Sequence, residues 1–566
     1  MGKQKETLSR RSFLQGAGIF AAGAAVVGLA GCATETAADA TARNANLDYL
    51  PEIWDYETDV LIVGFGGAGI AAATALATEN LGEFIVIEAA PKEGEGGNTR
   101  VSANLLLIPE SVDGAVTYQT ALNGAHTVEK ELIQGWAENL CENKEWLEGL
   151  GIELVQMNAY SPEFPEIEGS EFVRTYCADG IMGKNSLWNA MKDLQEELGY
   201  KVLHDTRGLE LYRNPMTNEA LGLRADQDGT TISIKARKGI VLCCGGFENN
   251  PDMCKDYLGV GQSKHPLGTP YNRGDGFKMV EPFGAKLWHM NNAAGSALAT
   301  WGQGLDVGVN STSLGYSKLP LHSYLFIGHD GKRFMYEETS MINRHGKVLS
   351  GGVFVDLPTP ENAWAVFDET FFTNVPISSQ IESLVGWPST HGTIIATDNQ
   401  GFFDAGVIVK ADTIKELAEL INVPLATLEK TLEAYNGYVA SGHDPDWRRG
   451  EVVYDATSGM GTDTVQSADG EPVEAVAPFA ITPVLPPYYA TPLPGSILNT
   501  QGGPKRNKFG QVLGNDDVVI DRLYGAGEFG AIYSYMYNGG GNVSDAIASG
   551  RAAARHAASL TPWDAK

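Results

Sequence analysis

Residues 58–78 read TDVLIVGFGGAGIAAATALAT. An apolar run with strand character leads directly into the pattern G-x-G-x-x-G, and an Ala-rich stretch that favours a helix follows. This strand–turn–helix context makes the glycine pattern specific for a dinucleotide. Gly64 permits the tight turn, Gly66 lets the backbone approach a pyrophosphate, and Gly69 lets helix and strand pack closely. The pyrophosphate, flanked by Gly67 and Ala68, then lies at the helix N-terminus, where N–H groups and the helix dipole favour anions.

A second apolar run continues the pattern. Residues 84–87 read FIVI and end in Glu88, which Ala89 follows. An acidic residue about 20 positions after the last glycine is the expected partner of the ribose hydroxyls in such a site. The alternation of strand and helix predicts an α/β fold with a Rossmann-like dinucleotide-binding domain.

Further glycine-rich segments recur along the chain. They are GEGGNTRVS at 94–102, IVLCCGGF at 240–247, NRGDG at 272–276, GKRFMYE at 331–337, LYGAGE at 523–528 and GGGN at 539–542. Together they resemble the motifs of the fumarate reductase-like flavoproteins, whose fold the 3-ketosteroid dehydrogenases share. The resemblance spans about residues 59–558.

This resemblance implies a cofactor, which is FAD bound without a covalent link. It implies that Glu528 binds the ribityl chain and that the loop 539–542, with the following helix, holds the flavin ring. The cofactor-binding residues expected on this basis are Gly64, Gly66, Gly67, Ala68, Gly69, Glu88, Ala89, Gly96, Gly97, Asn98, Thr99, Ser102, Gly245, Gly246, Asp275, Glu528, Gly541, Asn542 and Val543.

The same landmarks divide the chain. The first part of the FAD-binding domain is expected at 56–291 and its second part at 488–566. Between them, 292–487 is expected to form an inserted α+β cap domain for the substrate. Apolar positions with helical spacing predict two helices across 413–442 within this cap.

The expected pocket lacks the cations that a dicarboxylate requires. Two carboxylates need arginines placed for bidentate pairing, and the resemblance places three arginines and one histidine in fumarate reductases. The matching positions here are Asn538, the pair Phe371 and Phe372, the vicinity of Met341, and the vicinity of Asn499. Carboxylates left buried and unpaired cost several kcal/mol each. Fumarate and succinate are therefore rejected as substrates.

Aromatic side chains stand in place of those cations. Residues 537–541 read YNGGG and resemble the YPGPG segment of 3-ketosteroid dehydrogenases, in which a tyrosine hydroxyl and a glycine N–H polarise a ketone oxygen. The resemblance gives these catalytic roles to Tyr537 and Gly541, which would form an oxyanion hole for an enolate. Alternatively, Tyr537 only packs against the flavin. Arg344 and His345 are candidate proton donors, or else part of a solvated loop.

The first 31 residues are expected to form an export signal. Residues 9–14 read SRRSFL and precede a weakly apolar run, which is typical of a twin-arginine signal peptide. The run ends in LAGC at 29–32, which resembles a lipobox and predicts that Cys32 is lipidated. An uncleaved transmembrane anchor is the alternative, but the run is short and rich in Gly and Ala. Residues 32–55 then form a flexible tether, and the protein is a membrane-anchored lipoprotein at the cell surface or in the periplasm.

Composition restricts the partners. A chain of 566 residues suggests two or three domains. The formal net charge of −29 repels nucleic acid and anionic membranes, so a membrane is expected to be contacted only through the lipid anchor. The five cysteines after Cys32 match no zinc, iron–sulfur or haem spacing, so no metal site is predicted and the thiols are expected to be free.

Three functions are weighed against these features. The first is an exported reductase of a C=C bond conjugated to a carbonyl in an aromatic or bulky small molecule, which serves as a respiratory electron acceptor. Because no haem motif or flavin-carrier domain is present, its electrons are expected from a separate donor protein or a quinol-linked system. The second is the reverse reaction, as in a 3-ketosteroid dehydrogenase. The third, a substrate-binding lipoprotein, leaves the FAD motifs unexplained.

Overall fold

The architecture is described from a computed structural model. It covers residues 49–157, 162, 164, 167–259, 264–294, 299–301, 308–310, 323–335, 337, 343–344, 347–350, 353–356, 362–374, 386–387, 396, 398–447, 449, 482–493 and 495–565. Its contacts separate residues 51–566 from residues 1–50, and the fold below is that of 51–566. The predicted export signal and Cys32 lie outside the described residues. Across the described ranges, no helix combines the length and apolar character that crossing a membrane requires.

The largest sheet has parallel strands at its centre. Its order is β25-β26-β9-β1-β2-β6, and β8 pairs antiparallel with β9 and β7. Strands β26, β9, β1, β2 and β6 are parallel. The bounds are β1 Tyr56–Val63, β2 Phe84–Ile87, β6 Val202–Leu203, β7 Thr206–Arg213, β8 Ala220–Gln227, β9 Thr230–Leu242, β25 Gln511–Leu513 and β26 Val519–Gly525. The predicted α/β class and the strands expected at 58–63 and 84–87 are confirmed.

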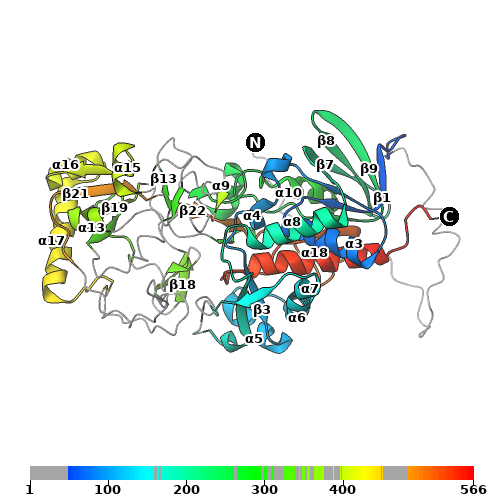
Figure 1. Cartoon of the computed structure of the whole chain (residues 1–566), viewed down its shortest axis with the longest axis horizontal. Helices are drawn as coiled ribbons and strands as arrows, with labels where there is room; N and C mark the ends of the chain where they lie inside the picture. The colour runs from blue at the N-terminus through cyan, green and yellow to red at the C-terminus, as the bar shows by residue number, and fades with distance from the viewer. Residues whose placement is uncertain are drawn as a thin grey trace, which may run out of the picture. The chain divides into compact units, whose positions relative to one another are not determined.

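Helices α3 and α18 lie side by side on one face of this sheet (Figure 1), and α10 packs on the other face. The bounds are α3 Gly67–Glu79, α4 Gly97–Arg100, α8 Ser186–Leu198, α9 Pro251–Leu258, α10 Asp275–Val280 and α18 Gly541–Ser559. Along β1, Val60 and Ile62 pack in the cluster that contains α3 and α18. Leu61 and Val63 pack in the opposite cluster, which contains α10. Because both faces are covered, the strand is a continuous apolar run rather than an alternating one.

Close packing around α3 depends on two glycines. A Cβ at Gly69 would lie 1.9 Å from the carbonyl oxygen of Gly64. A Cβ at Gly550 in α18 would lie 2.2 Å from the carbonyl oxygen of Ala68. Both distances are far below a van der Waals contact, so a larger residue would force the backbone apart. Gly69 therefore has the packing role that the glycine pattern predicts.

Smaller elements surround the main sheet. They are the antiparallel sheet β3 (Leu105–Pro109), β5 (Val173–Ala178) and β4 (Leu154–Gln156), and the helices α5 (Val112–Asn123), α6 (Lys130–Cys141) and α7 (Asn143–Gly149). Three short ladders join the segments on either side of the cap region: β10 (Lys264–Pro266) with β22 (Gly495–Ile497), β11 (Leu287–Trp288) with β24 (Gly503–Pro504), and β12 (Ala293–Ala294) with β23 (Asn499–Thr500). The described cysteines Cys141, Cys177, Cys243, Cys244 and Cys254 are free thiols.

The region predicted as the cap contains an antiparallel sheet in the order β15-β19-β21-β20. The bounds are β13 Ala299–Trp301, β14 Gly308–Asn310, β15 Tyr324–Ile327, β16 Asn343–Arg344, β17 Lys347–Ser350, β18 Val353–Asp356, β19 Trp364–Asp368, α13 Glu369–Asn374, α15 Asn399–Asp404, β20 Val409–Ala411, α16 Ile414–Leu420, α17 Leu425–Ser441 and β21 Tyr488–Pro492. Helices α16 and α17 confirm the two helices predicted across 413–442.

Strand β21 changes the position of one predicted boundary. It begins at Tyr488 and pairs with β19 and β20, so it belongs to the sheet of the cap region. Leu493, which follows it, is fully buried in the same core. The chain therefore leaves this sheet after Leu493 rather than at the predicted boundary of 487. An apolar run after two prolines predicts a strand, but its pattern does not indicate which sheet the strand joins.

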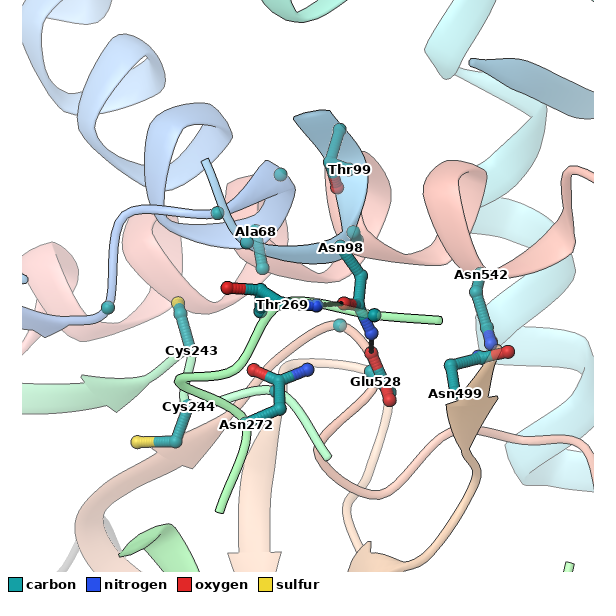
Figure 2. A pocket seen from close by; sticks show the side chains of 18 of the residues that line it. Ala68, Asn98, Thr99, Cys243, Cys244, Thr269, Asn272, Asn499, Glu528 and Asn542 are labelled. Carbon is teal, nitrogen blue, oxygen red and sulfur yellow. Dashed lines mark hydrogen bonds between the residues drawn. The ribbon is translucent and has the colours of Figure 1, made fainter. Parts of the chain in front are cut away.

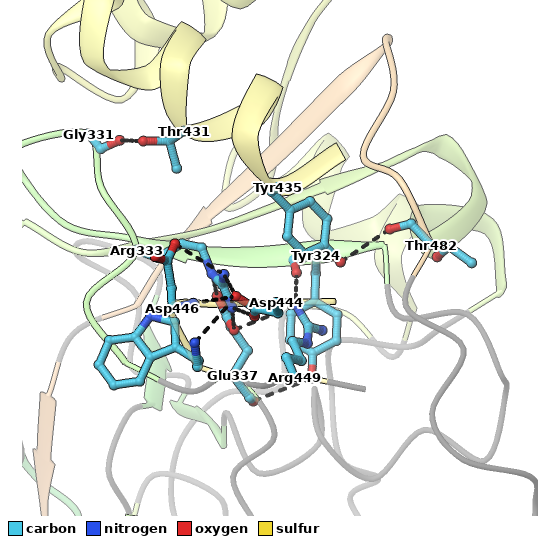
Figure 3. A network of polar contacts seen from close by, with 11 residues as sticks. Tyr324, Gly331, Arg333, Glu337, Thr431, Tyr435, Asp444, Asp446, Arg449 and Thr482 are labelled. Atoms are coloured by element: carbon cyan, nitrogen blue, oxygen red, sulfur yellow. Dashed lines mark hydrogen bonds and ion pairs between the residues drawn. The ribbon is translucent and has the colours of Figure 1, made fainter. Parts of the chain in front are cut away.

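Two arginines and two carboxylates are buried together in the cap region (Figure 3). Arg333 pairs with both oxygens of Glu337 at 2.7 Å and donates to both oxygens of Asp444. Arg449 lies 3.7 Å from Glu337 and donates to the Tyr324 carbonyl oxygen. Burial opposes ionisation of Asp444, but the hydrogen bonds and charge of Arg333 outweigh it and lower the pKa of Asp444. The network joins segments that are far apart in the sequence.

Replacing Arg333 by Met is expected to lower the free energy of unfolding of the cap region by about 3–5 kcal/mol, because two buried carboxylates lose their main partner. Urea unfolding followed by tryptophan fluorescence measures this change. The matched control is Lys332→Met, since the Lys332 side chain is 66% exposed and its removal changes stability by only about 0.5 kcal/mol. Equal losses in the two variants would show that the network contributes no net stability.

Candidate active site

A pocket lies where β1, β2, β9 and β26 end, at the carboxyl edge of the parallel strands. This edge is where ligands bind in doubly wound sheets. Most of the residues predicted to bind the cofactor line it. They are Gly64, Gly66, Gly67, Ala68, Glu88, Ala89, Gly97, Asn98, Thr99, Ser102, Gly245, Asp275, Glu528, Asn542 and Val543.

The other predicted cofactor residues support this pocket from behind. Gly69 packs against Gly64, as described above. Gly96 has a φ of +106°, and a Cβ there would meet the side chains of Arg100 and Trp188. A Cβ at Gly246 would meet three polar side chains that lie next to the pocket. Gly541 is the first residue of α18 and does not line the pocket.

The N-terminus of α3 forms an anion cradle. Gly66 lines the pocket, and the atoms nearest to a Cβ there would be backbone atoms of Gly96 and Gly97, at 3.6 and 3.7 Å. The first turn of α3 contains no acidic residue. Backbone N–H groups and the helix dipole therefore face the pocket without a competing negative charge. This arrangement fits a diphosphate.

Glu88 is held at the end of β2 by two backbone donors. The N–H of Phe65 donates to Oε2 at 2.6 Å, and the N–H of Ala90 donates to Oε1 at 2.8 Å. Burial raises the pKa of Glu88, and these hydrogen bonds oppose the increase. Its carboxyl is thus fixed beside the glycine turn and lines the pocket, where a ribose is expected.

Several polar contacts of the pocket were not predicted. Figure 2 shows Asn98 between Thr269 and Glu528. Asn98 Oδ1 accepts from the Thr269 N–H at 2.8 Å, and Asn98 Nδ2 donates to Glu528 at 3.0 Å. The same Nδ2 donates to Glu248 at 2.8 Å. An acidic residue directly after a strand and Gly-Gly-Phe is the signal that could have identified Glu248.

The predicted residue Asp275 also has a partner that sequence reasoning missed. Arg207, at the start of β7, forms an ion pair with the Asp275 carboxylate. Both residues line the pocket. The guanidinium therefore partly neutralises the acidic side chain at this end of the site. The pairing joins positions on β7 and α10, so spacing along the chain does not reveal it.

Tyr537 lines the pocket immediately before the closing glycines. Its hydroxyl oxygen accepts from the Asn542 N–H at 3.3 Å, so the phenol is oriented by the start of α18. Asn538, at the position that resemblance assigns to an arginine in fumarate reductases, is fully buried and accepts from the Tyr118 hydroxyl at 2.6 Å. The part of the closing loop that lines the pocket thus carries the Tyr537 phenol and the Asn542 amide and no cationic side chain.

The oxyanion role given to Gly541 needs correction. Its N–H donates to the Asn538 carbonyl oxygen at 2.9 Å, which closes the turn that starts α18. Gly540 in this turn has a φ of +83°, a conformation that glycine adopts readily. In this geometry the Gly541 N–H is already engaged, so Tyr537 is the one residue of the proposed pair that faces the pocket.

Phe371 and Phe372, and two tyrosines that precede Tyr537, pack against other side chains. Phe371 is fully buried in the core of the cap region, and Phe372 stacks on Tyr489 with ring centroids 4.3 Å apart. Tyr533 is fully buried, and Tyr535 stacks on His126. Met341, His345 and the side chain of Arg344 lie outside the described residues.

The comparison with protein families agrees with this geometry. The family described as FAD binding domain matches residues 59–544. The chain belongs to this family. FAD is therefore the cofactor of the site, and it supplies hydride chemistry that no amino-acid side chain provides. The cradle at α3, Glu88 and Glu528 are the residues that would hold it.

Characterised relatives of this FAD-binding protein span nearly its whole length. Digoxin reductase of Eggerthella lenta is 26% identical and covers 98% of both chains. The 3-oxosteroid 1-dehydrogenase of Mycolicibacterium smegmatis is 26% identical over 88% of this chain and 96% of its own. The crystal structure of a 3-ketosteroid Δ1-dehydrogenase from Sterolibacterium denitrificans shows the same fold, with a TM-score of 0.68, 19% identity, and coverage of 89% and 99%. This protein is an FAD-dependent oxidoreductase that acts on CH–CH bonds.

Proposed function

We propose that the protein reduces a C=C bond conjugated to a carbonyl in a bulky or aromatic, uncharged substrate, and that this compound serves as a respiratory electron acceptor. The observation that carries the proposal is the closing loop, where Tyr537 faces the pocket and Asn538 stands in the place of a cation. A phenol matches a neutral carbonyl oxygen, whereas a carboxylate would be left unpaired.

In this proposal the Tyr537 hydroxyl donates a hydrogen bond to the substrate carbonyl. Accepting from the Asn542 N–H orients the phenol and strengthens it as a donor. The hydrogen bond stabilises the negative charge that develops on the carbonyl oxygen when hydride reaches the β-carbon. FAD, held by the cradle at α3, Glu88 and Glu528, would supply that hydride. Arg344 and His345 remain the candidates for protonating the α-carbon.

The relatives support both the chemistry and the size of the substrate. One is named as a reductase of digoxin and another as a dehydrogenase of 3-oxosteroids. The second name favours the alternative proposal, in which this protein oxidises a ketosteroid-like molecule. Both reactions use the same carbonyl donor, so the direction of electron flow distinguishes them.

We also propose that the protein is exported by the twin-arginine route and anchored through lipidated Cys32. The SRRSFL and LAGC segments support this. The chain would then act at the cell surface or in the periplasm and receive electrons from a separate donor protein or a quinol-linked system. Metabolic labelling with a lipid analogue tests the anchor, because Cys32→Ser should abolish labelling.

Anaerobic reoxidation of the reduced protein tests the reaction itself. The protein is reduced with a stoichiometric reductant and mixed with a panel of enones, enoates and unsaturated steroids. Recovery of the oxidised flavin absorbance with one compound class, together with the saturated product, supports the proposal. If every panel member leaves the flavin reduced while a saturated ketosteroid bleaches the oxidised protein, the dehydrogenase alternative holds.

Fumarate is expected not to reoxidise the reduced protein. Each carboxylate left without its arginine costs about 3–5 kcal/mol, which slows the reaction at least about 100-fold per missing pair. Stopped-flow absorbance with fumarate, compared with the best panel compound, measures this difference. Reoxidation by fumarate as fast as by the best compound would contradict the interpretation that the site lacks the arginine that Asn538 replaces.

A further inference from the structure

Two carboxyl groups meet behind the pocket wall. Glu248 follows β9 and is 3% exposed, whereas Glu528 follows β26 and lines the pocket. A Cβ at Gly246 would lie 2.3 Å from Glu528 Oε1 and 2.7 Å from Glu248 Oε2. Both oxygens therefore border the same small space, which exists because residue 246 has no side chain.

Neither carboxyl has a cationic partner among the described residues. The ion pairs of that part of the chain include neither Glu248 nor Glu528. Instead the Asn98 amide bridges them, because its Nδ2 donates to one oxygen of each. Two adjacent carboxylates without a cation do not both ionise in a buried site, so the pair retains a proton.

The hydrogen bonds indicate where that proton lies. Glu528 Oε1 accepts from the Thr500 N–H at 3.0 Å, and Oε2 accepts from Asn98. Glu248 Oε1 accepts from both Asn98 and Asn272, at 2.8 and 2.9 Å. Glu248 Oε2 is buried and receives no donor from the described residues. The shared proton therefore lies between Glu248 Oε2, which no other donor from the described residues reaches, and Glu528, whose Oε1 borders the same space.

We propose that Glu248 Oε2 and the Glu528 carboxyl share one proton in a hydrogen bond, which makes Glu248 a positioning residue for the FAD contact of Glu528. This hydrogen bond fixes the Glu528 carboxyl, whose remaining lone pairs face the pocket. Glu248 itself does not line the pocket, so its effect on the cofactor acts through Glu528. This inference rests on FAD binding and is independent of the substrate.

The surroundings agree with a shared proton at neutral pH. Burial raises the pKa of Glu248 to about 7, against the effect of its amide hydrogen bonds. Burial and the charge of Glu248 raise the pKa of Glu528 as well. Cys254 is the titratable side chain that packs next to Glu248, and burial raises the pKa of its thiol to about 11. The thiol therefore stays neutral while the pair titrates.

The proton makes FAD affinity depend on pH. Bound FAD covers Glu528 and raises the proton affinity of the pair above that of the free protein. A group whose pKa is higher in the FAD-bound protein than in the free protein favours binding at low pH. This advantage is lost as the pH rises from the pKa of the free protein to the pKa of the bound protein. The dissociation constant of FAD is therefore expected to be constant below about pH 7 and to rise by up to about tenfold per pH unit above it.

Glu248→Gln tests the proposal on the FAD-loaded protein. The amide reproduces the protonated acid, because its oxygen accepts from Asn98 and Asn272 while its NH2 group donates to Glu528. The FAD dissociation constant, measured from the fluorescence of FAD released on dilution, is expected within about threefold of wild type at pH 6. It is expected to stay flat from pH 6 to 9, and the infrared carbonyl band of a buried carboxylic acid is expected to disappear.

A second variant separates positioning from folding. Glu248→Leu removes the donor to Glu528 and is expected to weaken FAD binding at least about tenfold at pH 6, with unchanged circular dichroism. If Glu248→Leu does not fold, the pH profile and the infrared band of Glu248→Gln still decide the matter. A pH dependence in Glu248→Gln equal to that of wild type, or an unchanged carboxylic acid band, would overturn the proposal.

Discussion

Tyr537→Phe is expected to lower turnover of the true substrate about 100- to 1000-fold while FAD content stays unchanged. The substitution keeps the ring that lines the pocket and deletes only the hydroxyl. Loss of one donor to a developing oxyanion costs about 3–4 kcal/mol in the transition state. Steady-state turnover with the compound identified by the reoxidation panel, together with the flavin-to-protein absorbance ratio, measures both parts of the prediction.

Tyr533→Phe is the matched control. Tyr533 packs edge-to-face against Tyr537, with ring centroids 5.1 Å apart, but it does not line the pocket. Its loss of a hydroxyl is expected to change turnover by less than about threefold, or about 0.65 kcal/mol. If Tyr537→Phe also stays within threefold of wild type, Tyr537 only packs against the flavin, and the donor is to be sought at Tyr535, Arg344 or His345.

Gly66→Ala is expected to weaken FAD binding at least about 100-fold and to leave the fold intact. The new methyl group would lie between the start of α3 and the backbone of Gly96 and Gly97, at ordinary contact distances of 3.6 and 3.7 Å, so the protein tolerates it while the cradle becomes narrower. The diphosphate loses its close approach to the backbone donors, and each hydrogen bond to a charged group is worth about 1.5–3 kcal/mol. Flavin content after gel filtration and the thermal unfolding curve measure the two effects.

Gly69→Ala provides the contrast within the same motif. Its methyl group would lie 1.9 Å from the Gly64 carbonyl oxygen, so the strand and helix must separate. This variant is expected to lose both the fold and FAD. Retention of wild-type FAD affinity in Gly66→Ala would show that the diphosphate lies elsewhere, and loss of folding in both variants would show that Gly66 also serves packing.

The parts of the fold that depend on local pattern could be predicted from the sequence. The turn from β1 to α3 combines a strand, three glycines and a helix within a short stretch, and Glu88 follows at a fixed distance. Helices α16 and α17 likewise follow from apolar spacing. The closing segment at 528–543 lies far from these residues in the sequence. It could be assigned to the same site only because its motifs resemble those of the fumarate reductase-like flavoproteins.

The contacts that depend on tertiary pairing could not be predicted. The bridge from Asn98 to Glu248 and the ion pair of Arg207 with Asp275 join distant segments, and residue types alone do not determine such partners. Residue types also do not show that the Gly541 N–H is used within its own turn. For β21, the predicted return to the FAD-binding domain lies at 488, because residue types do not show which sheet a segment joins and pairing is decided by the rest of the fold.

The ladder between β12 and β23 makes the cap region a replaceable module. Ala293 and Ala294 pair antiparallel with Thr500 and Asn499, so the chain enters and leaves the long insert through two neighbouring strands. Antiparallel strands can be joined by a two-residue turn. An exchanged or shortened insert would therefore keep both splice points on one ladder. The residues that cradle the diphosphate lie outside the insert, whereas Gly386 and Leu498 inside it also line the pocket, so an exchange is expected to keep the diphosphate contacts and to alter that other part of the pocket.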